Sequence, residues 1–255
     1  METGDRQIWI DGHFVPWADA TVHVLSHSLQ RGSLVFDYMS VHDCPRGAAI
    51  FRLDEHIERF LTSCELTGLA VGPSAAELRE AVRATVRANP GAKAVKVSGY
   101  LASIEVDVVP LDTHVTVAIA AYDPIADIAA HKPVPPPPRR SSIRLWIEKE
   151  RKNRRKDIVP PQAKTAANYA SPMVAKARAR AQGYDEIVLV DELGCIAEGP
   201  TTNIFLVDER GALVTPPTER VLLGVTRSSI LEIAAREGLV VREDRIRPDE
   251  LVAAR

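Results

Sequence analysis

The stretch Pro160-Pro161-Gln162-Ala163-Lys164-Thr165-Ala166-Ala167-Asn168-Tyr169 decides how the fold and the function of the chain are interpreted. Its lysine lies between a stiff Pro-Pro pair and a helix that we expect to begin near Asn168. On residue type alone a lysine is a solvated surface residue. The small apolar neighbours of Lys164 suit a partly buried amine, however, and Tyr169 is close enough for its phenol to share a site. We therefore interpret Lys164 as a candidate Schiff-base lysine.

Length, charge and cysteine content indicate a soluble intracellular protein. The 255 residues suffice for one large or two small domains, and a hydrophobic fraction of 45% supplies a core. A net charge of −2 gives no reason to expect nucleic acid or an acidic membrane surface as a partner. The N-terminus does not resemble a signal peptide, and no apolar run could span a membrane. Three widely spaced cysteines (Cys44, Cys64 and Cys195) favour a reducing, cytoplasmic location.

The first half of the chain predicts an α+β domain with an antiparallel sheet. Asp11-Gly12 between two apolar runs indicates a hairpin over residues 7–17. Residues 53–69 predict a helix with Asp54 as its N-cap, and its buried stripe consists of Ile57, Phe60, Leu61 and Cys64. The other expected elements are strands at 34–41, 94–100 and 115–121, a turn at 43–47, and a helix at 75–88 that Ser74 caps.

The second half predicts α/β organisation after a stiff connection. Prolines at 124, 133 and 135–138 favour an extended segment that joins neither a helix nor a central strand. We therefore expect an N-terminal domain at 1–122, a linker at 123–138, and a C-terminal domain at 139–255 that carries Lys164. Strands and helices alternate in that last part. The expected strands are 143–147, 187–190, 195–197, 203–207 and 239–241, and the expected helices are 168–183, 226–237 and 248–254.

Several other residues could complete a pyridoxal phosphate site around Lys164. The sequence has no dinucleotide, P-loop, zinc or serine-hydrolase motif. Gly224-Val225-Thr226-Arg227 opens a helix whose free N–H groups could bind a phosphate, and Arg59 could assist. Glu198 could keep the ring nitrogen protonated, and Tyr169 could donate to the ring oxygen. Each alone is more often an ordinary helix start, solvated helix face or turn, so the prediction depends on their joint presence.

Six segments of the chain resemble the class IV aminotransferases, the fold-type IV family of pyridoxal-phosphate enzymes. The segment from the lysine to the glutamate is the most specific, and it is most similar to branched-chain-amino-acid aminotransferases. The resemblance implies a two-domain architecture, with an α+β N-terminal domain and an α/β pseudo-barrel C-terminal domain. The segments are WIDG at 9–12, GSLVFD at 32–37, FRLDEHIERF at 51–60, AKTAANY at 163–169, GYDEIVLVDELGCIAEGPTTNIFLV at 183–207 and LLGVTR at 222–227.

The resemblance also implies a reaction and a role for each matching residue. The family transfers an amino group from an amino acid to a 2-oxo acid by a ping-pong mechanism, with pyridoxal 5'-phosphate as cofactor, and it is usually a homodimer. The implied roles are cofactor attachment and proton transfer for Lys164, phosphate binding for Arg59, Val225 and Thr226, pairing with the ring nitrogen for Glu198, bonding to the ring oxygen for Tyr169, and support of Glu198 or of the cofactor loop for Asn203.

The substrate side of the predicted site departs from the family pattern. Phe36 matches, but Tyr38 stands where a glycine often opens the pocket, and Arg31 stands where an aromatic residue is usual. Lys96 replaces an arginine that binds a carboxylate, and a lysine lacks the two-pronged geometry of an arginine. Lys96 could equally extend from its strand into solvent. We expect a substrate pocket that differs from that of a standard branched-chain enzyme.

Three other interpretations remain open at this point. A lyase of the aminodeoxychorismate type would use the same cofactor residues. The basic run at 149–156 could contact nucleic acid, although a solvated connection explains it more simply. The sequence also ends at Arg255, where the family continues into a strand and a Gly-Thr-Ala loop. It is therefore either a fragment or a chain whose site lacks one wall, which leaves an inactive homologue as a third alternative.

Overall fold

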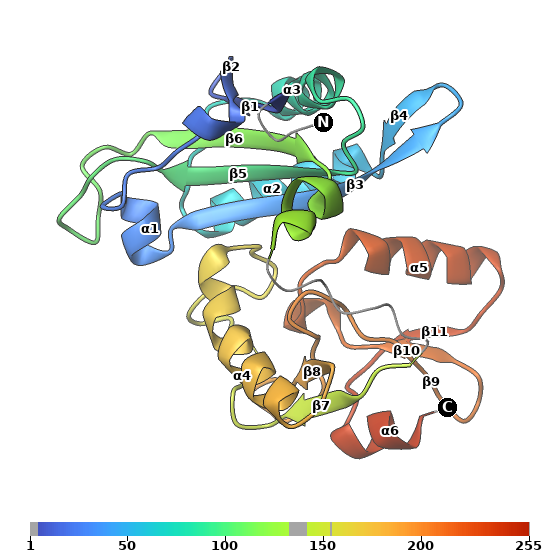
Figure 1. Ribbon diagram of the computed structural model, residues 1–255. Helices are drawn as coiled ribbons and strands as arrows, with labels where there is room; N and C mark the ends of the chain where they lie inside the picture. The colour runs from blue at the N-terminus through green and yellow to red at the C-terminus, as the bar shows by residue number, and fades with distance from the viewer. Residues whose placement is uncertain (1–4, 133–141, 154, 255) are drawn as a thin grey trace. The chain divides into compact units, whose positions relative to one another are not determined.

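The computed structural model describes residues 5–132, 142–153 and 155–254, and it contains two compact units (Figure 1). Unit 1 consists of Met1–Arg139 and Lys164–Ala167, and unit 2 consists of Arg140–Ala163 and Asn168–Arg255. Lys164 thus groups with unit 1, although its position in the sequence suggested the C-terminal domain. The expected bounds 1–122, 123–138 and 139–255 stay a prediction. Within the described residues, every helix is too short or too polar to cross a membrane.

A six-stranded antiparallel sheet forms the framework of unit 1, in the order β2-β1-β6-β5-β3-β4 (Figure 1). The hairpin around Asp11-Gly12 is confirmed. The expected strand at 34–41 continues to Cys44, so the turn at 43–47 shrinks to Pro45 and Arg46. The strands are β1 (Gln7–Ile10), β2 (His13–Pro16), β3 (Leu34–Cys44), β4 (Gly47–Ile50), β5 (Ala94–Leu101) and β6 (Val115–Tyr122).

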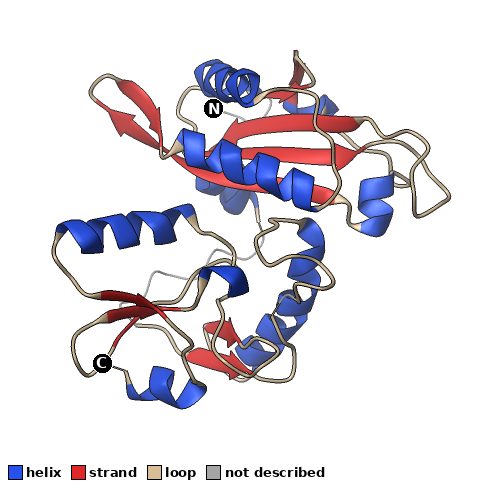
Figure 2. Ribbon diagram, turned by 180° about the vertical axis from the view of Figure 1, so that it is seen from behind, coloured by secondary structure: helices blue, strands red, loops and turns tan. Residues whose placement is uncertain are grey.

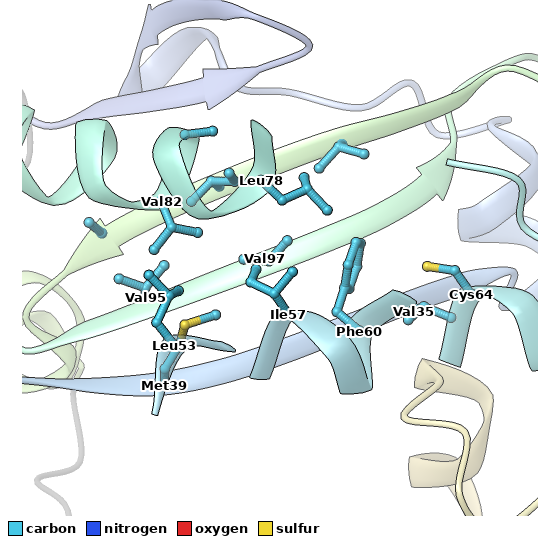
Figure 3. Close-up of a cluster of buried hydrophobic side chains, with 14 of the residues drawn as sticks. Val35, Met39, Leu53, Ile57, Phe60, Cys64, Leu78, Val82, Val95 and Val97 are labelled. Atoms are coloured by element: carbon cyan, nitrogen blue, oxygen red, sulfur yellow. The ribbon is translucent and has the colours of Figure 1, made fainter. Parts of the chain in front are cut away.

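Two helices, α2 (Leu53–Leu66) and α3 (Ala75–Ala88), pack against the sheet and enclose the core of unit 1 (Figure 3). Figure 2 shows this helix layer from behind. Ile57, Phe60 and Cys64 of the predicted stripe are buried against Val35, Met39 and Val97 of the strands, and Leu61 packs at the edge of the core. A short helix α1 (His27–Arg31) precedes β3. The stripe was predictable because a helix repeats every 3.6 residues.

The helix starts show one correct and one wrong prediction. Ser74 caps α3 in a capping box with Glu77, as expected. Asp54 is not the N-cap of α2, because the helix begins at Leu53 after Arg52, which has a left-handed φ of 45°. Asp54 lies in the first turn instead, where a negative charge still favours the helix dipole.

The segment after β6 is helical where an extended linker was expected. Pro124–Ile128 and Ala129–His131 form short helical turns of unit 1, and the remaining prolines of the stretch lie outside the described residues. Pro124 is compatible with a helix start, and the Asp123 carboxylate accepts from the N–H groups of Ile125 and Ala126. Asp127 of the first turn forms a buried ion pair with Arg6, whose Nε lies 2.8 Å from Asp127 Oδ2.

Unit 2 contains two small sheets with helices packed on them. Strands β7 and β8 pair in parallel and carry α4, whereas β10 pairs with β9 and β11. The expected strand at 195–197 is reduced to bridges from Ile196 to Val190 and Ile246. The expected helix at 168–183 begins as a 3-10 turn at Ala166–Tyr169. The elements are β7 (Leu145–Glu148), α4 (Ala170–Ala181), β8 (Glu186–Leu189), β9 (Leu206–Val207), β10 (Leu213–Thr215), α5 (Val225–Arg236), β11 (Val241–Glu243) and α6 (Pro248–Ala253).

Candidate active site

The backbone around Lys164 is attached to the edge of strand β3 in unit 1. The Phe36 N–H donates to the Lys164 carbonyl at 3.1 Å, and Thr165 Oγ1 donates to the Leu34 carbonyl at 3.0 Å. On its other side, the Lys164 N–H donates to Ser63 Oγ of α2 at 3.0 Å. These bonds fix the direction in which the lysine side chain leaves the chain, and that side chain is only partly buried.

The Phe36 ring brings two lysine side chains together. Lys164 Nζ lies 4.9 Å from the ring centroid, and Lys96 Nζ of β5 lies 4.5 Å from it. Both are cation–π distances, at which the ring face attracts an ammonium group. Tyr38 pairs in register with Lys96 and is 43% exposed. Strand alternation therefore places Phe36, Tyr38 and Lys96 on the same face of the sheet.

Arg31, the fourth expected substrate residue, lies at the end of α1. Its Nη2 donates to the Val106 carbonyl at 2.6 Å in the loop between β5 and β6. The recorded contacts of the described residues connect Arg31 to this loop and not to Lys164. Its contact with a substrate stays a prediction.

Arg59 is held by a buried carboxylate on the helix-facing side of β3. Asp37 is fully buried, and its two oxygens accept from Arg59 Nε and Nη2, each at 2.8 Å. His56 Nδ1 lies 2.7 Å from the same carboxylate, so we assign it as a donor. Burial alone would raise the pKa of Asp37, but the hydrogen bonds and charges of His56 and Arg59 outweigh burial and lower that pKa.

Glu198 of unit 2 is a buried carboxylate surrounded by amide donors. It is 4% exposed, and Oε2 accepts from the Leu222 N–H at 3.1 Å. Asn203 Nδ2 lies 3.5 Å from Oε2, and Asn153 Nδ2 lies 3.4 Å from Oε1. Asn153 was not predicted as a site residue, because it lies in a basic run that we interpreted as a solvated connection. The only signal in the sequence is that it is an amide among charged residues.

The start of α5 offers N–H groups for an anion. Gly224 is its N-cap and has no side chain to cap the helix, and the first recorded helical bond joins the Ser228 N–H to the Gly224 carbonyl. Within the described residues, no helical bond therefore uses the N–H groups of Val225 and Thr226. A Cβ at position 224 would lie 1.9 Å from Asn203 Oδ1, so glycine is needed for this close packing. Such a helix start binds phosphate or carboxylate groups.

The contacts thus form two groups, one in each unit. Those of unit 1 join Lys164 with Phe36 and Lys96, and Ser63 links the Lys164 N–H to the Arg59 carbonyl. Those of unit 2 join Glu198 with Asn203 and the start of α5. Tyr169 is the last residue of the 3-10 turn before α4 and is partly buried. Among the described residues, no group of three His, Cys, Asp or Glu side chains could hold a metal ion.

Comparison with known proteins identifies the family. Residues 34–255 match the family described as amino-transferase class IV. A branched-chain-amino-acid aminotransferase from Pseudomonas aeruginosa is 33% identical over 255 residues, which cover 100% of this chain and 80% of that protein. The chain therefore belongs to the class IV aminotransferase family.

Solved structures of branched-chain aminotransferases share the fold. The enzyme from Thermoproteus uzoniensis, solved with norvaline, has a TM-score of 0.86 and 33% identity, covering 98% of this chain and 82% of that one. The enzyme from T.th., solved with N-(5'-phosphopyridoxyl)-L-glutamate, has a TM-score of 0.86 and 32% identity, and the match covers 98% of this chain and 80% of that one. The expected fold-type IV architecture is confirmed. The chain is a pyridoxal-phosphate-dependent aminotransferase, and the relatives give no support to the lyase alternative.

The donor groups of the chain fit that cofactor. A partly buried amine suits imine formation, and the uncapped start of α5 suits a phosphate group. The Glu198 carboxylate is buried and held by amide donors, which suits a charged partner for a pyridine nitrogen.

Asp37 should make the stability of unit 1 depend on acid pH. Its folded pKa is lowered, so its contribution is complete above about pH 4 and is lost as the pH falls through the folded value. We expect Asp37→Asn to lower the free energy of unfolding by about 3–5 kcal/mol at neutral pH, because it removes one partner of a buried ion pair. Urea unfolding between pH 7 and pH 3 would measure the difference, which should shrink in acid. A difference that stays constant over this range would contradict the assignment.

Proposed function

We propose that the protein transfers amino groups between aliphatic, branched-chain-like amino acids and 2-oxo acids by a ping-pong mechanism. The attachment of Lys164 to β3, with its amine beside the Phe36 ring, is the observation that carries the proposal. The substrate class is supported by the name that the Pseudomonas aeruginosa relative bears and by the norvaline in the Thermoproteus uzoniensis structure.

The proposed cofactor contacts use both groups of residues. Lys164 binds pyridoxal 5'-phosphate covalently, and Arg59, the Val225 N–H and Thr226 hold its phosphate. Tyr169 donates to the ring oxygen. Asn203 supports Glu198, as the distance of 3.5 Å between Nδ2 and Oε2 indicates. When bound, the cofactor supplies an electron sink for the bond that breaks at the amino-acid Cα.

The chain contributes binding, orientation and proton transfer. Amide donors bind both Glu198 oxygens, and this carboxylate would pair with the protonated ring nitrogen. The Lys164 amine, once released from the cofactor by the substrate, would carry a proton between the substrate Cα and the cofactor C4′. The Phe36 ring lies beside the side-chain nitrogens of both Lys96 and Lys164.

Replacement of Lys164 should abolish the colour of the enzyme. We expect wild-type protein with pyridoxal phosphate to be yellow and to bleach with borohydride, whereas Lys164→Ala should lose the visible band and all measurable transfer. Lys93→Ala, which removes an exposed lysine from the same unit, is the control and should stay yellow. Absorbance spectra and circular dichroism would separate loss of attachment from loss of fold. Wild-type protein that cannot be coloured by added pyridoxal phosphate would count against the function itself.

The substrate pocket should be narrower than in a standard branched-chain enzyme. Tyr38 stands beside Lys96 on the face that carries Phe36, and its phenol stays neutral because burial and then Asp123 raise its pKa. A tyrosine at this position takes up space that a large side chain of the substrate would need.

We expect Tyr38→Ala to raise kcat/KM for leucine relative to norvaline about tenfold, the scale of one or two methylene groups in a pocket. Tyr38→Phe keeps the bulk and should leave the ratio unchanged. A panel of amino donors with 2-oxoglutarate would measure both variants. A wild-type enzyme that already prefers leucine, isoleucine and valine, with no change in Tyr38→Ala, would refute the narrow pocket.

We further propose that the enzyme is a cytoplasmic homodimer. The three cysteines are free thiols, which suits a reducing compartment. One end of unit 1 exposes many apolar side chains, and Val106 and Leu111 are 97% and 94% exposed. His27 of α1 joins the two parts of this apolar end surface through hydrogen bonds to Ser103 and Val108 of the loop between β5 and β6. The apolar end surface consists of Val24, Leu25, Leu29, Ile104, Val106, Val108, Val109 and Leu111.

Charges on the apolar end surface should separate the dimer, since a second copy would have to bury them unpaired. We expect the double variant Val106→Asp, Leu111→Asp to elute with the mass of one chain, and wild-type protein with the mass of two. Val252→Asp, at an exposed position of α6, is the control and should remain a dimer. Size-exclusion chromatography with light scattering would measure the mass. A monomeric wild-type protein would refute the proposal.

A further inference from the structure

We propose that Asp37 is a positioning residue that aims the Arg59 guanidinium at the phosphate group of the cofactor. The inference rests on the proposed function, in which Arg59 is a phosphate ligand. Asp37 itself is buried behind Arg59 and need not touch the cofactor.

The first argument is geometric. Arg59 Nε and Nη2 both bind the Asp37 carboxylate at 2.8 Å, one to each oxygen. A guanidinium group is planar, so two parallel bonds fix its plane and the direction of its third nitrogen, Nη1. An arginine without such a partner rotates about several side-chain bonds, and it loses this conformational entropy when it binds an anion. Because Asp37 already holds Arg59 in one conformation, this entropy is lost on folding and not on binding. Binding is therefore stronger without any new contact to the ligand.

The second argument comes from the strand that carries Asp37. Phe36, the preceding residue, donates its N–H to the Lys164 carbonyl. Adjacent residues of β3 therefore fix Lys164 from the strand edge and Arg59 from the helix-facing side. Ser63 closes the arrangement, since it accepts from the Lys164 N–H and donates to the Arg59 carbonyl at 2.7 Å. A shift of β3 would move the amine and the guanidinium group together.

The third argument is that burying the Asp37 carboxylate costs free energy. A fully buried carboxylate loses its hydration and needs charged partners on both oxygens, which Arg59 and His56 supply. An apolar pair could fill the same space without that requirement, so a carboxylate at this position is most useful if it orients its arginine for a function.

Unit 1 also contains a matched pair that serves as a control. Arg6 and Asp127 are 3% and 6% exposed, and Arg6 Nε lies 2.8 Å from the carboxylate. Its Nη1 donates to the carbonyls of Asn89 and Pro90, so this guanidinium group is consumed by structure. Asp127→Asn therefore tests what the loss of a buried Arg–Asp pair does by itself.

The experiment measures how strongly the full-length protein prefers pyridoxal phosphate to unphosphorylated pyridoxal. The ratio of the two dissociation constants, obtained by absorbance titration of protein freed of cofactor, isolates the contribution of the phosphate. We expect Asp37→Asn to reduce this ratio about tenfold or more, the scale of a hydrogen bond to a charged group. Asp127→Asn should lower the melting temperature but leave the ratio unchanged.

The outcomes separate the inference from the function on which it rests. If Asp37→Asn and Asp127→Asn both lower stability and both keep the wild-type ratio, Asp37 is a structural residue only and the inference is wrong. If wild-type protein binds neither compound, the proposed function fails instead. If Asp37→Asn does not fold, Asp37→Glu decides, because it keeps the charge but moves the carboxylate by one methylene. Its ratio should fall about threefold or more, the scale of a weakened hydrogen bond, and an unchanged ratio would overturn the inference.

Discussion

The pairing of Lys164 and Thr165 with the first part of β3 is the constraint on which the candidate site depends. Strand β4 pairs only with residues 41–44 of β3, which leaves backbone groups of Leu34 and Phe36 to bond the lysine segment. A lysine on a loop alone would lose much side-chain and backbone entropy when it binds a cofactor. Because hydrogen bonds to the strand already hold the backbone of Lys164, only the side chain loses conformational entropy when the cofactor binds.

The alternation of β3 explains how one strand serves several purposes. Val35, Asp37 and Met39 face the helices, whereas Phe36 and Tyr38 face the opposite side. Asp37 is the exception to an otherwise apolar inner face. Its burial is tolerated because an arginine and a histidine reach it from the first two turns of α2. The same strand therefore places aromatic residues on one face of the sheet and a carboxylate behind an arginine on the other.

Sequence periodicity predicted the elements that have a repeated pattern of buried residues. It did not predict the features that depend on single contacts between distant residues. The stripe of Ile57, Phe60 and Cys64 follows from helical geometry. The candidate site was predictable only as far as the family resemblance named its residues, since the contacts that hold them lie between distant parts of the chain. The bridge from Thr165 to Val35, which attaches the lysine segment to unit 1, is such a contact. Long-range hydrogen bonds of this kind leave no periodic trace in a single sequence.

The charge distribution around Phe36 also constrains what can bind there. Two ammonium groups, those of Lys96 and Lys164, lie 4.5 and 4.9 Å from one ring centroid, and like charges so placed repel. The ring face attracts each of them but cannot cancel their mutual repulsion. If Lys96 contacts the substrate, as the sequence predicts, its ammonium group would favour substrates with a carboxylate over amines without an acid group.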